Sequence, residues 1–462
     1  MTKANVSIDG DQAFAVEQHG IDHIPETERR GSPVDLAWLW AGANINVPYI
    51  VLGGLLLGLG LTMHQMLAVV LIGNLSFLFV GMGSVPGARA GTATLVIGRA
   101  SFGRKGGVIP ATVAKLTVVG WEAVNIVLGI FALFAFFSLV GIPLGLLGKV
   151  LALGALVAVT FCVAILGHAT IETMQRIFTW VLGAVILYVL FQVAGTKPAT
   201  TIKLVAGADF KSLLIGFSLV TAMPASYATV PAEYARYLPR NTSARAITIW
   251  TALGGFVPAV LITMIGYLAA NATGIRDPLA EFQPLLPAWL FGAFLLTVVA
   301  GTIANNFVTT YSSGMALLAM GVKVTRPVAI MLDAVLATTG AAYAIFFHDF
   351  TDIFVSFLSL SLIWIAPWWA IYLVDARLRE DGYCGDEMLS GGGGRYRFRN
   401  GWRLEGMGSW VIGMLAALFC SANSLFVSPF AKSVLQGADL TVPAGMVIAG
   451  TSYWLSTRSK AV

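Results

Sequence analysis

Twelve apolar stretches, each long enough to cross about 30 Å of hydrocarbon as a helix, run through residues 34–455. A chain inside a bilayer must satisfy its backbone hydrogen bonds internally, so stretches of this length are restricted to helices. The composition agrees, because 57% of the 462 residues are hydrophobic and 11% are charged, whereas about a quarter of a soluble domain is charged. The sequence therefore predicts an all-α integral membrane protein with twelve transmembrane helices.

The distribution of positive charge predicts how these helices are oriented. If the N-terminus is cytoplasmic, 22 of the 28 Lys and Arg residues fall on the inner side. This bias follows the positive-inside rule, so we expect a multi-pass protein of the plasma (inner) membrane with cytoplasmic N- and C-termini. It also accounts for the pI of about 9.1 without nucleic-acid binding. Residues 1–33, with six acidic and three basic side chains, are predicted to form a largely extended cytoplasmic tail rather than a cleaved leader.

Two of the stretches contain polar residues and proline at mid-membrane depth. The first is interrupted by Asn44, Asn46 and Pro48, and the sixth is interrupted at 221–227 around Pro224. Proline removes a backbone donor and clashes with the preceding turn. Freed backbone groups persist at this depth only where protein or a wet cavity satisfies them, so we predict a functional break at both places rather than a simple kink.

Paired interruptions at corresponding places in two halves of a chain indicate an inverted-repeat transporter with its site near the membrane midplane. We therefore expect two five-helix repeats followed by two extra helices. The predicted parts, in chain order, are the N-terminal tail 1–33, the first repeat 34–194, an extracellular linker 195–210, the second repeat 211–375, a cytoplasmic loop 376–407, and the last two helices with the C-terminal tail in 408–462.

The third apolar stretch carries Trp121, Glu122 and Asn125 within five residues. Positions i, i+1 and i+4 fall on one side of an α-helix, so the indole, the carboxyl and the carboxamide can face a single cavity. A charged group at the centre of a membrane costs about 3 kcal/mol or more, and such residues are functional by default. Together they predict a site for a flat, hydrogen-bonding solute.

Each of these residues also has a structural alternative. Trp121 could face lipid or pack against a neighbouring helix. Glu122 could act on substrate or a proton, or it could form a structural pair with Lys115 or with an asparagine of the eighth stretch. Asn305 and Asn306 of that stretch could serve only to hydrogen-bond neighbouring helices. Because a carboxyl buried from water exchanges its proton near neutrality, Glu122 is the first candidate for proton coupling.

Other classes of function are not supported by the residue pattern. The three cysteines, Cys162, Cys384 and Cys420, are far apart in sequence and give no disulfide framework, zinc site or redox motif. The sequence shows no cluster of metal-binding His and Cys residues. It also shows no paired aspartates on the predicted helices and no Ser–His dyad at a spacing that would bring the two side chains together. We therefore expect no enzyme activity, no cofactor and no certain metal site. A channel would not need two broken helices related by a repeat.

With these residues in view, the sequence resembles the nucleobase cation symporter-1 family, in particular its purine and cytosine permease branch. Six segments in the same order carry the resemblance: E-Q-H-G-I-D-H-I-P-E-T-E-R-R (17–30), R-A-S-F-G-R-K-G (99–106), G-W-E-A-V-N (120–125), P-A-E-Y-A-R-Y-L-P (231–239), N-N-F-V-T-T-Y-S-S-G (305–314) and A-P-W-W-A-I-Y-L-V-D-A-R-L (366–378). The resemblance implies a leucine-transporter-type 5+5 inverted repeat with broken helices 1 and 6.

The resemblance also implies roles for particular residues. Trp121 would stack on the ring of a base, and Asn125 would hydrogen-bond its edge. Family members often place an aromatic residue where Met223 or Pro224 stands here, so the second aromatic wall around the base is either missing or supplied by Tyr227. The full set of expected substrate-binding residues is Trp121, Glu122, Asn125, Ser226, Tyr227, Asn306 and Asn46.

For the coupling ion the resemblance implies either Na⁺ or H⁺. Backbone carbonyls at Gly42 and Ile45 would form one half of a sodium site. The hydroxyl residues that complete such a site in relatives are replaced by Ala304 and Asn305. The expected coupling residues are therefore Gly42, Ile45 and Asn305 for an ion, and Glu122 for a proton.

The function that this resemblance implies is import of a nucleobase, cytosine or a purine, by cation symport with alternating access. The alternative is symport of another planar heterocycle, such as allantoin, hydantoin, a thiamine-precursor pyrimidine or a cationic, guanidinium-like ring. The expected partners are a small heterocyclic substrate and the lipid bilayer, without nucleic acid, and a monomer is the default assembly.

Overall fold

The computed structural model describes residues 13–14, 17, 19–196, 207–274, 277–347, 350–379, 382–389, 395–396, 398–423 and 426–458. Within these ranges the regular elements are helices, and the only β pairing is two isolated bridges. Most of the predicted linker 195–210, and parts of the predicted tail 1–33 and loop 376–407, lie outside the described residues.

The membrane-spanning elements follow the predicted order. Eight spans of the described chain are long and apolar enough to cross a membrane, and a bent helix pair adds a ninth. They are α1 (Pro33–Asn44) with α2 (Pro48–Gly58), α3 (Met63–Asn74) with α4 (Phe77–Ala90), α7 (Val108–Leu139), α8 (Leu146–Leu166), α9 (His168–Ala194), α12 (Ala244–Thr273), α13 (Ala288–Ala319), α14 (Arg326–Phe347) and α15 (Phe350–Leu378). The shorter α10 (Phe210–Ser226), α17 (Leu404–Phe419) and α19 (Thr441–Thr457) bring the total to the expected twelve.

The first helix breaks where the sequence predicts. The axes of α1 and α2 differ by 62°, and Pro48 is the first residue of α2, a position where its missing N–H costs nothing. The amide of Asn44 donates to Trp40 O at 2.7 Å, and that of Asn46 donates to Ala43 O at 2.9 Å. Asn46 therefore satisfies a carbonyl that the break frees inside the membrane, and Asn44 adds a side-chain bond within the last turn of α1.

The sixth helix breaks slightly later than predicted. We expected the interruption at 221–227, but α10 continues through Pro224 to Ser226 and the chain turns at 227–231 before the short α11 (Ala232–Ala235). A proline so close to a C-terminus costs only one hydrogen bond. The helix thus survives Pro224 and ends beside Tyr227.

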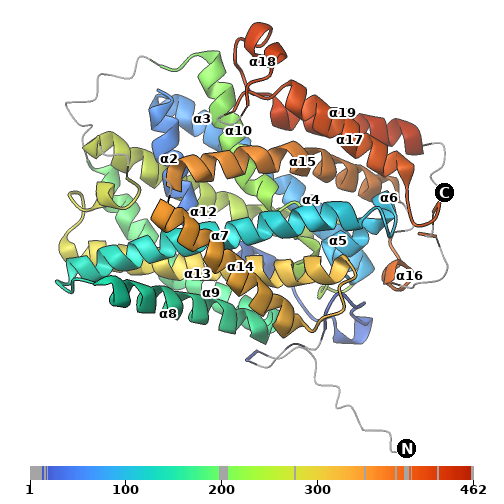
Figure 1. Ribbon diagram of the computed structural model, residues 1–462, viewed down its shortest axis with the longest axis horizontal. Helices are drawn as coiled ribbons and strands as arrows, with labels where there is room; N and C mark the ends of the chain where they lie inside the picture. Colours follow the sequence, from blue (N-terminus) through green and yellow to red (C-terminus); the bar gives the residue numbers. More distant parts are fainter. Residues whose placement is uncertain are drawn as a thin grey trace, which may run out of the picture.

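The helices divide into two groups. In one, α12 packs against α1, α2 and α4, with α3, α10 and α11 attached; in the other, α13 packs against α7, α8 and α14. We call these the α12 group and the α13 group. α9 contacts both, and α15, α17 and α19 pack together beside them. Figure 1 shows α7, α13 and α8 running side by side, with α17 and α19 along the opposite edge.

The described part of the N-terminal tail is packed against the protein, which corrects the expectation of a largely extended tail. Ile24 is fully buried, and its N–H donates to Gly91 O at 2.9 Å. Arg29 donates to Ala88 O at 2.9 Å. We call this end of the molecule, which also holds the short helices α5 (Thr94–Ile97), α6 (Arg99–Phe102) and α16 (Gly385–Leu389), the tail end; it lies to the right in Figure 1.

Candidate functional site

A small cavity lies where both helix breaks meet α7 and α13. It is lined by Asn46 from the α1–α2 break, by Val118 and Trp121 of α7, by Met223, Ser226, Tyr227 and Val230 at the end of α10 and the following turn, and by Asn305, Val308 and Thr309 of α13. One wall therefore comes from the α12 group and the other from the α13 group. The free volume is about 20 Å³, enough for one water molecule. A cavity of this volume has no room for a larger ligand in this conformation.

Trp121 forms the largest aromatic surface of this cavity. Its ring packs edge-on against Phe354 and Phe357 of α15, with centroid distances of 6.1 and 5.5 Å. These contacts fix the orientation of the indole, and its Nε1–H has no hydrogen-bond partner among the described residues. The Oδ1 atom of Asn46 is also buried without a partner. Two residues that line the cavity thus each carry one polar atom without a hydrogen-bond partner among the described residues.

A chain of amides runs across the cavity wall. Asn305 Nδ2 donates to Ala43 O at 2.7 Å and to Tyr227 Oη at 2.9 Å. Asn125 Nδ2 donates to the Oδ1 atoms of Asn305 and Asn306, at 2.6 and 2.9 Å. These bonds tie α7 and α13 to the break in the first helix.

The structure places three of the expected substrate residues behind the cavity. Asn125, Asn306 and Glu122 are at most 1% exposed and do not line it. The amide of Asn305, expected near the coupling ion, lies between them and the cavity. Trp121, Asn46, Ser226 and Tyr227 do line it. The expectation that Trp121, Glu122 and Asn125 face a single cavity is therefore wrong for this conformation, because Glu122 points toward α13 and α14.

Several lining residues were absent from the sequence-based set. Val118 precedes Trp121 by three residues, and Val308 and Thr309 follow Asn305 by three and four, so helical spacing from the chosen residues identifies all three. Met223 lines the cavity, whereas Pro224 does not. Met223 and Tyr227 therefore both lie on the side of the cavity that the α12 group forms.

The region expected to hold a coupling ion contains a glutamine side chain. Gln175 of α9 donates from Nε2 to Ala304 O at 2.6 Å, and its Oε1 is buried without a partner beside Gly42. The carbonyl of Ile45 lies against Gly301, where a Cβ would approach it to 2.2 Å. Gly301 and Ala304 carry no hydroxyl side chain, and the Gln175 side chain lies beside Gly42.

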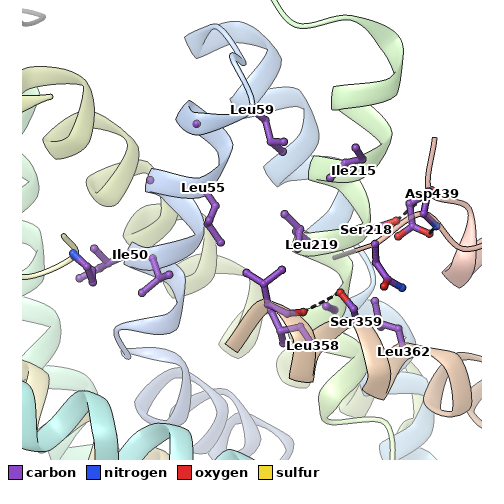
Figure 2. A pocket seen from close by; sticks show the side chains of 18 of the residues that line it. Ile50, Leu55, Leu59, Ile215, Ser218, Leu219, Leu358, Ser359, Leu362 and Asp439 are labelled. Carbon is purple, nitrogen blue, oxygen red and sulfur yellow. Dashed lines mark hydrogen bonds between the residues drawn. The ribbon is translucent and has the colours of Figure 1, made fainter. Parts of the chain in front are cut away.

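A much larger vestibule opens on the side away from the tail end. It has a volume of about 720 Å³ and lies between α2, α10 and α15. Figure 2 shows Leu55, Leu59, Ile215, Leu219 and Leu358 directed into it, with Ser218, Ser359 and Asp439 at one side. Ala222 lines the vestibule and the next residue, Met223, lines the cavity. The two spaces are thus lined by consecutive residues of α10.

One acidic residue of the vestibule is buried in the loop between α12 and α13. Glu281 is 1% exposed and its Oε1 atom has no hydrogen-bond partner in the described residues. Burial, with a contribution from nearby Asp277, raises the pKa of this carboxyl to about 9. Glu281 therefore holds its proton at neutral pH.

The tail end is closed by polar contacts between the two helix groups. Ser312 of α13 donates to Glu233 of α11 at 3.0 Å, and Tyr234 donates to Val308 O at 2.7 Å. Below them lies a set of residues that we call the tail cluster: Glu17, Arg236, Tyr237, Tyr311 and Arg326.

Glu17 is the centre of the tail cluster. Its carboxylate accepts from Arg236 at 3.1 Å and from Arg326 at 2.9 Å, and both tyrosines donate to it. Burial alone would raise the pKa of Glu17, but the two arginines and the Tyr237 hydrogen bond outweigh it and lower the pKa. Arg236 belongs to the α12 group and Arg326 to the α13 group, so Glu17 joins the two groups.

These features define a secondary transporter of the inverted-repeat type. They are the two groups of helices, the site at paired helix breaks, the open vestibule on one side and the closed face on the other. The profile of a family described as permeases for cytosine/purines, uracil, thiamine and allantoin matches residues 23–441. The chain belongs to this family, whose members are permeases and not enzymes.

Individual relatives span nearly the whole chain. It is 26% identical over 460 residues to YxlA of Bacillus subtilis strain 168, covering 96% of each protein. It is 24% identical to the purine-cytosine permease fcyB of Emericella nidulans, covering 95% of this chain and 87% of that protein. Among solved structures it is similar to Mhp1, a nucleobase-cation-symport-1 family transporter in a closed conformation with bromovinylhydantoin bound, with a TM-score of 0.73, 16% identity and 96% of each chain covered. This likeness confirms the predicted fold.

Proposed function

We propose that this protein imports a nucleobase, cytosine or a purine, together with a cation, by alternating access. The observation that carries the proposal is the composition of the cavity between the two helix groups. One indole, two carboxamides and three hydroxyl side chains surround it, including an unused donor on Trp121 and an unused acceptor on Asn46. A nucleobase presents a flat ring and an edge of mixed donors and acceptors, which matches this set.

Each lining residue has a proposed role. Trp121 stacks on one face of the ring, while Met223 and Tyr227 cover the other. Asn46, Ser226 and Asn305 hydrogen-bond its edge. Asn125 and Asn306 hold the Asn305 amide in place, and they reach the substrate only if the chain of amides rearranges. Glu122 remains a coupling residue in this proposal.

The direction of transport rests on the orientation of the protein. We propose that the tail end is cytoplasmic and that the vestibule faces outward across the plasma (inner) membrane, in agreement with the positive-inside bias. The expected repeats, 34–194 and 211–375, place one broken helix in each half. A single chain contains the complete cavity, so a monomer is sufficient for transport.

The coupling cation and the substrate each have a named alternative. Na⁺ would use carbonyls at Gly42 and Ile45, with Asn305 nearby, and H⁺ would use Glu122. Other planar heterocycles are favoured by two relatives: Mhp1 was solved with a bound hydantoin, and a vitamin B6 transporter of Saccharomyces cerevisiae is 26% identical over 334 residues, covering 66% of this chain and 55% of that protein.

The experiment that tests the proposal is a binding panel on purified protein with cytosine, adenine, hypoxanthine, uracil, allantoin, hydantoin and pyridoxine, with and without sodium. A ligand present at 100 times its Kd stabilises the native state by about 2.7 kcal/mol, which thermal unfolding detects. Trp121→Ala should weaken binding by about 1 to 3 kcal/mol, the usual value of one stacked base, while Trp180→Ala at the exposed surface serves as control. Absence of binding by every nucleobase would refute the substrate class.

A further inference from the structure

A second set of buried polar side chains lies behind the cavity, between α7, α13 and α14. Lys115 of α7 donates to the carboxylate of Asp333 on α14, and to Ser313 of α13 at 2.8 Å. Glu122 lies seven residues after Lys115, on the same face of α7. Both carboxyl groups belong to residues with no exposed surface. We call Lys115, Glu122 and Asp333 the α7 cluster.

The charges of the α7 cluster do not balance if both acids are ionised. Neither oxygen of Glu122 has a hydrogen-bond partner among the described residues, and Asp333 Oδ2 has none either. One ammonium group therefore faces two carboxyl groups in the interior of the membrane. A third, uncompensated charge there costs several kcal/mol. The geometry accommodates one additional proton, and Glu122, neither of whose oxygens is hydrogen-bonded to a described residue, is the residue that can hold it.

The charged groups that act on Glu122 belong to the α7 cluster itself. Asp333 and Lys115 are the charged groups that act on it, and the Thr310 hydroxyl of α13 is the polar group beside it. On α8, which packs against the same helices, the described titratable side chains are Lys149 and Cys162, both exposed. Arg326, at the start of α14, is bound to Glu17 in the tail cluster.

A hydrogen-bonded path connects Glu122 to the substrate cavity. Its backbone carbonyl accepts from Asn306 Nδ2 at 3.3 Å, and Asn306 Oδ1 accepts from Asn125 at 2.9 Å. Asn125 also donates to Asn305, which lines the cavity. A shift of α7 at Glu122 therefore changes the amides that face the substrate, although the carboxyl itself does not touch the cavity.

We propose that the α7 cluster is the site of the coupled proton, with Glu122 as the group that gains and loses it. Lys115 and Asp333 act as a fixed charge pair that positions this carboxyl. The proposal rests on cation-coupled uptake and selects H⁺ as the cation. The step is a simple proton exchange: the Glu122 carboxylate takes a proton from water on one side of the membrane, and the resulting acid returns it to water on the other side.

The test compares Glu122→Gln with Glu122→Asp in proteoliposomes, using radiolabelled cytosine and hypoxanthine as probes. Glu122→Gln should keep exchange of internal for external probe, because Glu122 is outside the cavity, but lose accumulation driven by a pH gradient. Glu122→Asp, which keeps an ionisable group, should restore part of that accumulation. Glu122→Gln that accumulates probe like the parent protein, or a parent protein driven only by sodium, would overturn the proposal.

A second measurement does not depend on the substrate. Infrared difference spectra recorded across a pH titration should show a protonated carboxyl that titrates in the parent protein and is missing in Glu122→Gln. Glu281→Gln is the matched control, because it removes a buried neutral carboxyl elsewhere and should leave that signal in place. If no probe is exchanged, the proposed function fails while this signal still decides the proton site. A Glu122 signal that never titrates would refute it.

Discussion

The tail cluster and the α7 cluster each contain a buried glutamate, and the two glutamates differ in their hydrogen bonding. In the tail cluster, Glu17 accepts hydrogen bonds on both oxygens from two arginines and two tyrosines. In the α7 cluster, Glu122 is also buried, and neither of its oxygens has a hydrogen-bond partner among the described residues. The first arrangement stabilises a permanent negative charge, whereas the second favours a carboxyl that carries a proton.

The clusters also differ in where they lie relative to the two helix groups. The tail cluster joins the α12 group, through Arg236, to the α13 group, through Arg326 and Tyr311. The α7 cluster lies entirely inside the α13 group, on α7 and α14, and Lys115 also contacts Ser313 of α13. If transport separates the groups at the tail end, the bonds of Glu17 must break and those of Lys115 need not. One cluster thus joins the two helix groups, and the other lies within a single group.

The largest effect is expected from Lys115→Met, which leaves Asp333 without a cation. Asp333 must then either remain an unpaired buried charge or take up a proton. Protonation of an ordinary aspartate at pH 7 costs about 4 kcal/mol, since each unit between its pKa and the pH corresponds to about 1.4 kcal/mol. We expect a loss of about 4 kcal/mol in the free energy of unfolding, measured by denaturation in mixed micelles, and a smaller loss at lower pH.

The double variant Lys115→Met with Asp333→Asn is the control for this prediction. Removing both charges from a buried pair is often close to neutral, so most of the lost stability should return. If the single variant is as stable as the parent protein at pH 7, Lys115 and Asp333 are not a tightly paired fixed charge.

A somewhat smaller effect, about 3 kcal/mol, is expected from Arg236→Met. Removal of one partner from a buried ion pair is strongly destabilising, but Glu17 keeps Arg326 and two tyrosines. Because Arg236 connects the helix groups, the variant should also loosen the tail end. A cysteine introduced at Ser312 in a background lacking the three native cysteines should then react faster with a thiol reagent added from that side. Unchanged reactivity would show that the tail cluster does not control closure.

The difference between the clusters also shows what the sequence could predict. The spans and the break in the first helix follow from local pattern, because apolar length and the position of Pro48 decide them within one stretch. The sequence predicts the break in the sixth helix only approximately, because α10 continues through Pro224 to Ser226. The clusters depend on residues far apart in the chain: Glu17 meets Arg326 and Lys115 meets Asp333 only after the helices pack. The same reason explains why Asn125 and Asn306 were expected in the cavity while they lie behind Asn305. Spacing along one helix cannot tell which neighbour occupies the space in front of a side chain.

A still smaller effect is expected when the free energy of unfolding is measured at acid pH, where Glu17 of the tail cluster takes up a proton. The pKa of Glu17 is lowered below its ordinary value of 4.5 in the folded protein. The stability that this lowering contributes is therefore fully present above about pH 4.5 and is lost as the pH falls through the folded pKa. We expect the free energy of unfolding to decrease in that window for the parent protein and to change less for Glu17→Gln. A parallel pH dependence in both proteins would contradict the fixed charge on Glu17.

The smallest effect is expected from Arg176→Gln, which tests whether burial causes these differences. Arg176 of α9 contacts Asp35 of α1 at 2.7 Å, but its side chain is 49% exposed. An exposed ion pair contributes between zero and about 1 kcal/mol, because water and salt screen it and two long side chains lose freedom. The unfolding free energy should therefore change by less than about 1 kcal/mol, and the change should disappear at high salt. A loss as large as that of Arg236→Met would mean that position between helices, rather than burial, sets the strength of these ion pairs.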